Sequence, residues 1–199
     1  MVAVGPAGAV AGGGLAALAG YAVFRRGRWL GVPRDPPPAL AAAAAGVAGA
    51  LVGWAAARGD GWLALALAAV VGAAAADLVA RVIPHRWVLA LALAGGGEMW
   101  RGILPVAPTV LVTLGVAGFL LAVHLVSRGG LGLGDVKLGL GMGLALGWPR
   151  AVTALVWGLW LGGMVAAGLL VTHRARRGAA VPLGPFLAVG MIGVAVLTA

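Results

Sequence analysis

The sequence has no cysteine and few acidic residues. Among its 199 residues, 5 are Asp or Glu and only 10% are charged. The absence of cysteine excludes disulfides, thiolate nucleophiles and cysteine-based zinc or iron sites. The three histidines, His85, His124 and His173, are far apart in the sequence, and their spacing does not predict a metal site. The sequence therefore predicts chemistry that uses no metal and no other cofactor.

Most residues of the chain are apolar. They make up 62% of the chain, and the mean hydropathy is +1.07. Such a chain would expose large apolar surfaces in water, so the composition predicts an integral membrane protein and excludes a soluble enzyme. Each span takes about 20 residues, so the length predicts one membrane-embedded domain, residues 1–199, with little extramembrane structure. The start of the chain lacks basic residues before Arg25, which favours a retained first span over a cleaved signal peptide.

The apolar runs predict an all-α transmembrane bundle of about eight helices. The runs are broken by charged residues, proline and glycine. The expected helices cover residues 2–24, 39–57, 61–80, 87–103, 107–126, 138–147, 150–172 and 183–199. Between the first two, residues 25–38 form a short, proline-rich loop. The 36 glycines, mixed with alanine, are expected to let helices approach closely, since packing drives helix association in lipid.

Basic residues give this topology an orientation. With the amino terminus outside, the inner loops hold eleven Lys and Arg and the outer loops three, which accounts for all 14. This bias fits the positive-inside rule, so both termini are expected on the outer side of the inner membrane. The net charge of +9 then serves to anchor the inner loops to anionic lipids, and no nucleic-acid partner is needed to explain it.

Two aspartates stand out in this setting. Asp77 and Asp135 lie at ends of apolar runs, with two predicted spans between them, so both are expected at the cytoplasmic face. Ionisable groups at the edge of a bilayer are functional candidates. Two close carboxyl groups that share a proton can hydrolyse a peptide bond, because one takes a proton from water while the other supports the scissile carbonyl. The sequence predicts Asp77 and Asp135 as a catalytic pair.

The neighbours of these aspartates suit such a site. Gly132 and Gly134 permit backbone conformations that other residues resist, and Pro84 sets a turn after the span that carries Asp77. Lys137 can hold charge near the site or reach the headgroups. Other polar residues have simpler interpretations. Glu98 is expected at the outer edge without a role, His85 in a loop, His124 at a helix end, and tryptophans such as Trp29, Trp87, Trp100 and Trp148 in an interfacial belt.

At these residues the chain resembles the type 4 prepilin peptidase family, the intramembrane aspartyl proteases with a Gly-x-Gly-Asp motif that include preflagellin peptidases. Three stretches carry the resemblance: residues 77–84, which end in Ile-Pro; residues 130–138, which contain Gly-Leu-Gly-Asp-Val-Lys-Leu; and residues 181–190, Val-Pro-Leu-Gly-Pro-Phe-Leu-Ala-Val-Gly. Presenilin-like and signal peptide peptidases resemble it less, because Ala76 precedes Asp77 where their first aspartate follows Tyr.

The resemblance implies removal of the leader peptide from type IV prepilin-like or flagellin-like precursors at the cytoplasmic face. Asp77 and Asp135 would be the catalytic pair, and Pro182, Gly184 and Pro185 would support the substrate groove or a loop. The partners implied are those precursors, membrane lipids and components of a pilus or secretion assembly. Bifunctional family members carry a cysteine-containing cytoplasmic domain where this chain has residues 25–38, so N-methylation is not expected.

Two other functions agree with the same residues. A transporter or channel could use Asp77 and Asp135 as ion or proton ligands, since glycine-broken helices also occur in such proteins. An inactive scaffold of a pilus or secretion machine would keep the helices without any catalysis. A transporter would lose flux on Asp135→Asn substitution, whereas a scaffold would tolerate Asp77→Ala.

Overall fold

The chain folds into α-helices joined by short turns. The computed structural model describes residues 37–128, 130–172 and 182–198, and within these ranges there are seven helices and no strand. They are α2 (Pro38–Ala57), α3 (Gly61–Ala80), α4 (His85–Trp100), α5 (Val106–Val126), α6 (Leu133–Leu146), α7 (Arg150–Val171) and α8 (Gly184–Thr198). The all-α fold is thus confirmed for this part of the chain. The predicted helix at 2–24 and residues 25–36 of the predicted loop lie outside the described residues, so the count of eight stays a prediction.

Four of these helices are long and apolar enough to cross a membrane. They are the segments Ala39–Ala57, Gly61–Ala80, Val106–Val126 and Arg150–Val171. Three helices are shorter: α4 has 16 residues, α6 has 14 and α8 has 15. The composition and these helices together indicate a membrane protein. The side of the membrane that each end faces stays a prediction.

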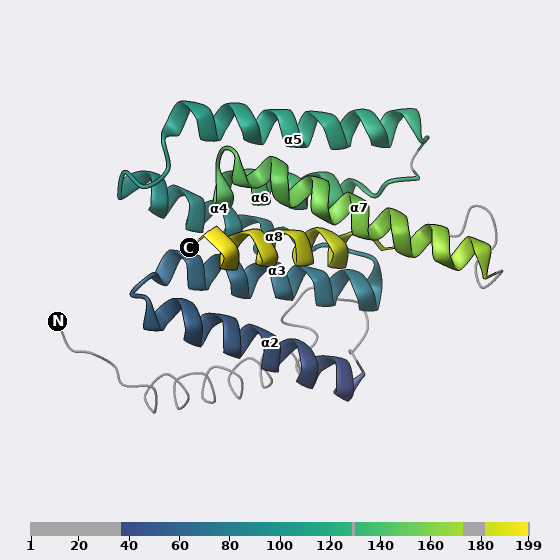
Figure 1. Ribbon diagram of the computed structural model, residues 1–199, viewed down its shortest axis with the longest axis horizontal. Helices are drawn as coiled ribbons and strands as arrows, with labels where there is room; N and C mark the ends of the chain where they lie inside the picture. Colours follow the sequence, from purple (N-terminus) through teal and green to yellow (C-terminus); the bar gives the residue numbers. More distant parts are fainter. Residues whose placement is uncertain (1–36, 129, 173–181, 199) are drawn as a thin grey trace.

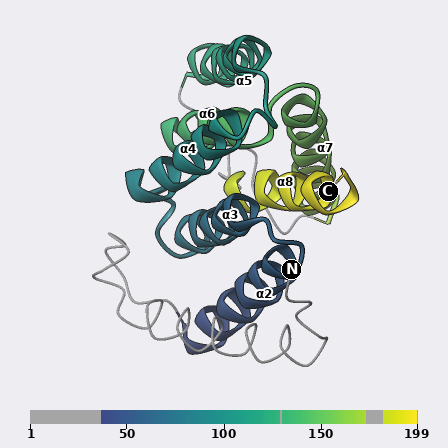
Figure 2. The same cartoon turned by 90° about the vertical axis from the view of Figure 1, so that its left-hand side faces the viewer.

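The helices form a bundle in which α3 and α8 occupy the middle. Figure 1 shows the long helices running side by side, and Figure 2, turned by 90°, shows α2 and α5 at opposite edges. The central helix α3 contacts α2, α4, α6 and α8, while α6 packs against α4 and α5. This connectivity lets the end of α3 meet the start of α6, although more than 50 residues separate Asp77 from Asp135.

All seven predicted helices within the described residues are present, but two of them, α4 and α6, begin more than one residue earlier than expected. The sixth predicted helix, 138–147, begins at Leu133, so Asp135 lies in its first turn rather than in the preceding loop. The fourth, 87–103, runs from His85 to Trp100, so the prediction of His85 as a loop residue was wrong. The reason is Pro84, which is the N-cap of α4 and lets the helix start directly after it.

Glycines bring the helix backbones close together, as their abundance predicted. A Cβ atom on Gly143 would lie 2.7 Å from the Cα of Thr113 in α5, and one on Gly158 would lie 2.9 Å from the Cα of Leu187 in α8. Real Cβ atoms essentially never come so near backbone atoms. At these positions glycine is required by the packing of α5, α6, α7 and α8, in agreement with the small-residue interfaces of membrane helices.

Gly95 provides a test of this packing. A Cβ atom there would collide with the backbone carbonyl of Leu144, whereas the neighbouring Gly96 has no atom within 4 Å of its Cβ position. We expect Gly95→Ala to push α4 away from α6 and to lower the free energy of unfolding by about 1–3 kcal/mol. Gly96→Ala should leave it unchanged or raise it slightly, because alanine favours helix more than glycine does.

Reversible unfolding of both variants in detergent measures the difference. Both substitutions add the same methyl group to the same helix, so intrinsic helix propensity cancels in the comparison. Equal stabilities would show that α4 and α6 are not in the close contact described here.

Candidate active site

Asp77 lies near the end of α3 and points at the start of α8. Its side chain is 7% exposed, and its Oδ2 atom accepts a hydrogen bond of 3.0 Å from the backbone N–H of Gly184, the first residue of α8. The first N–H groups of a helix have no partner within that helix. Asp77, from a distant part of the chain, therefore accepts a hydrogen bond from one of these N–H groups. Its carboxyl group also lies at the positive end of the α8 dipole.

Glycine at position 184 makes this contact sterically possible. A Cβ atom there would lie 2.7 Å from Oδ2 and 3.1 Å from Cγ of Asp77. Pro182 lies just before α8, and Pro185 is its second residue, where the lack of an N–H carries little cost. Of the three residues predicted to support the site, Gly184 directly contacts Asp77; for Pro182 and Pro185 the structure gives only their places at the start of the helix.

Asp135 occupies the first turn of another helix. It is the third residue of α6, its N-cap is Gly132, and it is 8% exposed. Its Oδ2 atom lies over Gly132, 3.2 Å from where a Cβ would be. Its Oδ1 atom is buried and has no hydrogen-bond partner among the described residues. A buried acceptor without a partner is costly, so this oxygen is placed to bind a water molecule or a substrate N–H.

The turn between α3 and α4 brings the two aspartates to the same end of the bundle. Ile83 in this turn is buried, and a Cβ on Gly134 would lie 3.4 Å from its side chain, so the turn lies against the start of α6. The charge of Asp77 acts on Asp135, which places the two carboxyl groups within electrostatic reach of each other. Around them meet the starts of α4, α6 and α8, whose dipoles all present positive ends.

Local hydrogen bonds hold the segment that precedes Asp135. His124 Nδ1 lies 2.6 Å from the carbonyl oxygen of Leu131, which can only accept, so this ring nitrogen carries the hydrogen. Ser127 accepts from the Leu131 N–H and donates to the His124 carbonyl, at 3.2 Å in both cases. His124 was predicted at a helix end facing water or a neighbour, and its neighbour is this loop. The loop therefore fixes where α6 begins.

A hollow of about 570 Å³ opens beside the aspartates. It is lined by the turn after α3 and by the first turns of α4 and α6, namely Arg81, Val82, Ile83, Pro84, His85, Arg86, Gly132, Leu133, Gly134 and Lys137. We call it the basic hollow, because four of these side chains are Arg, Lys or His. Lys137 Nζ lies 3.3 Å from His85 Nε2, so the predicted site residue Lys137 contacts a histidine that the sequence did not link to it.

A second acidic group lies at the opposite end of the bundle. Glu98 is 8% exposed, and its interpretation as an incidental residue at the outer edge stays a prediction. Arg101 donates to it at 3.4 Å and lies 3.6 Å from Asp60, the N-cap residue of α3. Asp60 accepts from the Leu63 N–H at 2.9 Å. These contacts tie α3 to α4, and they give the carboxyl groups of this end a cationic partner. Asp135 has no such ion pair within the ranges that the structure describes.

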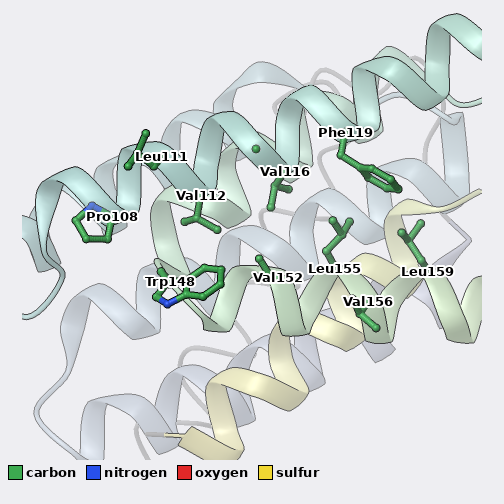
Figure 3. Close-up of a pocket in the computed structure, with 11 residues that line it drawn as sticks. Pro108, Leu111, Val112, Val116, Phe119, Trp148, Val152, Leu155, Val156 and Leu159 are labelled. Atoms are coloured by element: carbon green, nitrogen blue, oxygen red, sulfur yellow. The ribbon is translucent and has the colours of Figure 1, made fainter.

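Another cavity contains no chemistry-bearing group. It measures about 770 Å³ and runs between α5 and α7, with the side chains of the two helices facing each other across it (Figure 3). Its lining is hydrophobic throughout: Pro108, Leu111, Val112, Gly115, Val116, Phe119, Trp148, Val152, Leu155, Val156 and Leu159. Within the described part of the chain, no group of three or more His, Cys, Asp or Glu gathers where a metal ion could bind.

Comparison with known proteins finds a match to a protein family. The model of the type IV leader peptidase family matches residues 71–167, a range that contains Asp77, Asp135 and the whole lining of the basic hollow. The resemblance to prepilin peptidases is thus confirmed over this part of the chain, and the match supports a protease of the leader peptidase type with prepilin-like substrates. No curated protein and no solved structure gives a match.

Proposed function

We propose that this protein is an intramembrane aspartic endopeptidase of the leader peptidase type. It removes the leader of type IV prepilin-like precursors at the cytoplasmic face of the inner membrane, and Asp77 and Asp135 together activate the attacking water. The proposed reaction is hydrolysis without N-methylation, because the sequence contains no cysteine for the domain that accompanies methylation in the family. The observation that carries the proposal is that two buried carboxyl groups lie at the same end of the bundle, within electrostatic reach of each other. One of them has an oxygen with no hydrogen-bond partner among the described residues.

Helix capping alone explains these aspartates less well. A capping carboxylate is usually supplied by the residue just before its own helix and lies at the surface. Asp60 at the start of α3 is such a residue, with its side chain 30% exposed. Asp77 instead reaches α8 across 107 residues of sequence, and both Asp77 and Asp135 are buried within electrostatic reach of each other. Burying two like charges together costs free energy. The arrangement is therefore better explained by a function that needs both carboxyl groups.

The geometry is compatible with the chemistry of a shared proton. One ionised carboxylate takes a proton from water as the water oxygen attacks the scissile carbonyl carbon. The protonated partner donates a hydrogen bond to the carbonyl oxygen, and its proton passes on to the leaving amine. The unpartnered Oδ1 of Asp135 offers a place for that water. Because α6 is about 21 Å long, it is shorter than a hydrocarbon core of about 30 Å, which leaves room for a water-filled recess at its start.

The experiment is cleavage of a prepilin-like precursor by the purified chain in lipid nanodiscs. We expect the precursor to lose the mass of its leader and the new amino terminus to lie just before its hydrophobic segment. The matched control is the variant with both Asp77→Asn and Asp135→Asn, which should leave the precursor intact. Equal cleavage by both proteins would overturn the proposal. Ion flux in vesicles without any cleavage would favour the transporter interpretation instead.

A further inference from the structure

The basic hollow has more positive charge than its surroundings neutralise. Among the described residues, the ion pairs of the protein involve Arg101 at the other end of the bundle, and none joins Arg81, Arg86 or Lys137 to a carboxylate. Arg81 is within electrostatic reach of Asp77. Lys137 makes its contact with His85, which is not an anion. The hollow therefore offers exposed positive charge that an anionic ligand could pair with.

The backbone adds to this preference for an anion. The hollow is lined by Pro84, His85 and Arg86 at the start of α4 and by Gly132, Leu133 and Gly134 at the start of α6. The first N–H groups of both helices lack partners within their helices, and both dipoles present a positive end. Helix starts combined with basic side chains are a common way to bind phosphate groups.

The rim of the hollow also suits a lipid. Val82 and Leu133 line it, and they are 47% and 52% exposed, so apolar surface adjoins the basic groups. A volume of about 570 Å³ is that of a small-molecule site. A ligand with a phosphate and attached acyl chains fits this pairing of charge and apolar surface, whereas free phosphate would leave the apolar side chains uncovered.

We propose that the basic hollow binds the headgroup of an anionic phospholipid. Its phosphate would lie among Arg86, Lys137 and the starts of α4 and α6, with the acyl chains leaving past Val82 and Leu133. Basic pockets between membrane helices bind such headgroups in other proteins. A consequence for catalysis rests on the proposed function: a bound phosphate neutralises the hollow and lets a positively charged leader approach the aspartates.

The test measures lipid retention by native mass spectrometry in the absence of any precursor, so it does not depend on cleavage. Purified chain is equilibrated with equal amounts of phosphatidylglycerol and phosphatidylcholine. We expect the wild type to retain phosphatidylglycerol in preference. Each basic residue near an anionic lipid contributes about fivefold in affinity, so the variant with Arg86→Gln and Lys137→Gln should bind it roughly 25-fold more weakly.

Arg58→Gln is the matched control, because Arg58 is an exposed arginine that stacks on Trp54 between α2 and α3, away from the hollow. This variant should retain phosphatidylglycerol as the wild type does. Equal retention by all three proteins would overturn the proposal. Displacement of the lipid by inorganic phosphate would assign the hollow to a free anion, and displacement by the precursor would assign it to the substrate; either result would also overturn it. Circular dichroism confirms that the variants are folded.

Discussion

Replacing Asp77 by asparagine is expected to lower the rate of leader removal on the order of 10³-fold or more, and Asp135→Asn should do the same. Asparagine keeps the volume of the side chain, and its amide oxygen can still accept the hydrogen bond from Gly184. It cannot take a proton from water or donate one as a carboxylic acid does. The loss therefore reports on proton transfer and not on the packing of α8.

Two comparisons make this result specific. The variant with both substitutions should be no slower than either single variant, because residues that act as a unit have non-additive effects. Asp60→Asn supplies the matched control at the opposite end of the bundle, where asparagine can replace aspartate as the N-cap of α3. It should cleave as the wild type does. Two partial, additive losses from the single variants would contradict a shared proton. Single-turnover cleavage in nanodiscs, followed by mass, gives the rates.

The sequence was sufficient to predict the helices, because long apolar runs between charges and prolines have few other folds in a membrane. It was less reliable at the start of α6. Gly134, Asp135 and Lys137 lower the hydropathy there, so the apolar run begins at Leu138, although the backbone already turns into a helix at Leu133. Helix starts tolerate glycine and favour acidic residues in their first turn, which hydropathy does not register.

The aspartates themselves could be found from the sequence, since the chain has few acidic residues and acidic groups at the ends of apolar runs need a functional explanation. Their contacts could not be found in this way. The hydrogen bond from Gly184 to Asp77 joins residues 107 positions apart, and it depends on how α3 and α8 pack. The motif around Gly184 gave the only signal, and it came from the family resemblance. The burial of Glu98 and the contact of His85 with Lys137 likewise depend on the packing of α4, and no local pattern indicates them.

A single methyl group at position 184 is expected to remove most of the activity, although the substitution leaves both catalytic carboxyl groups in the sequence. The Cβ of Gly184→Ala would lie 2.7 Å from Oδ2 of Asp77, so the carboxyl group must turn away or α8 must retreat from α3. Either movement displaces Asp77 relative to Asp135. A displacement of about 1 Å in a catalytic group can lower a rate by about 100-fold, and we expect kcat to fall by that order while the precursor still binds.

Gly193→Ala is the control on the same helix, since nothing lies within 4 Å of the Cβ position of Gly193. It should retain wild-type kcat, and both variants should show the same helical content. The two measurements that decide the matter are kcat and the binding of the precursor, taken separately. A Gly184→Ala enzyme with unchanged kcat would show that the contact between the start of α8 and Asp77 does not position the carboxyl group during catalysis. A loss of binding with unchanged kcat would show that Gly184 contributes to the substrate groove and does not position Asp77 for catalysis.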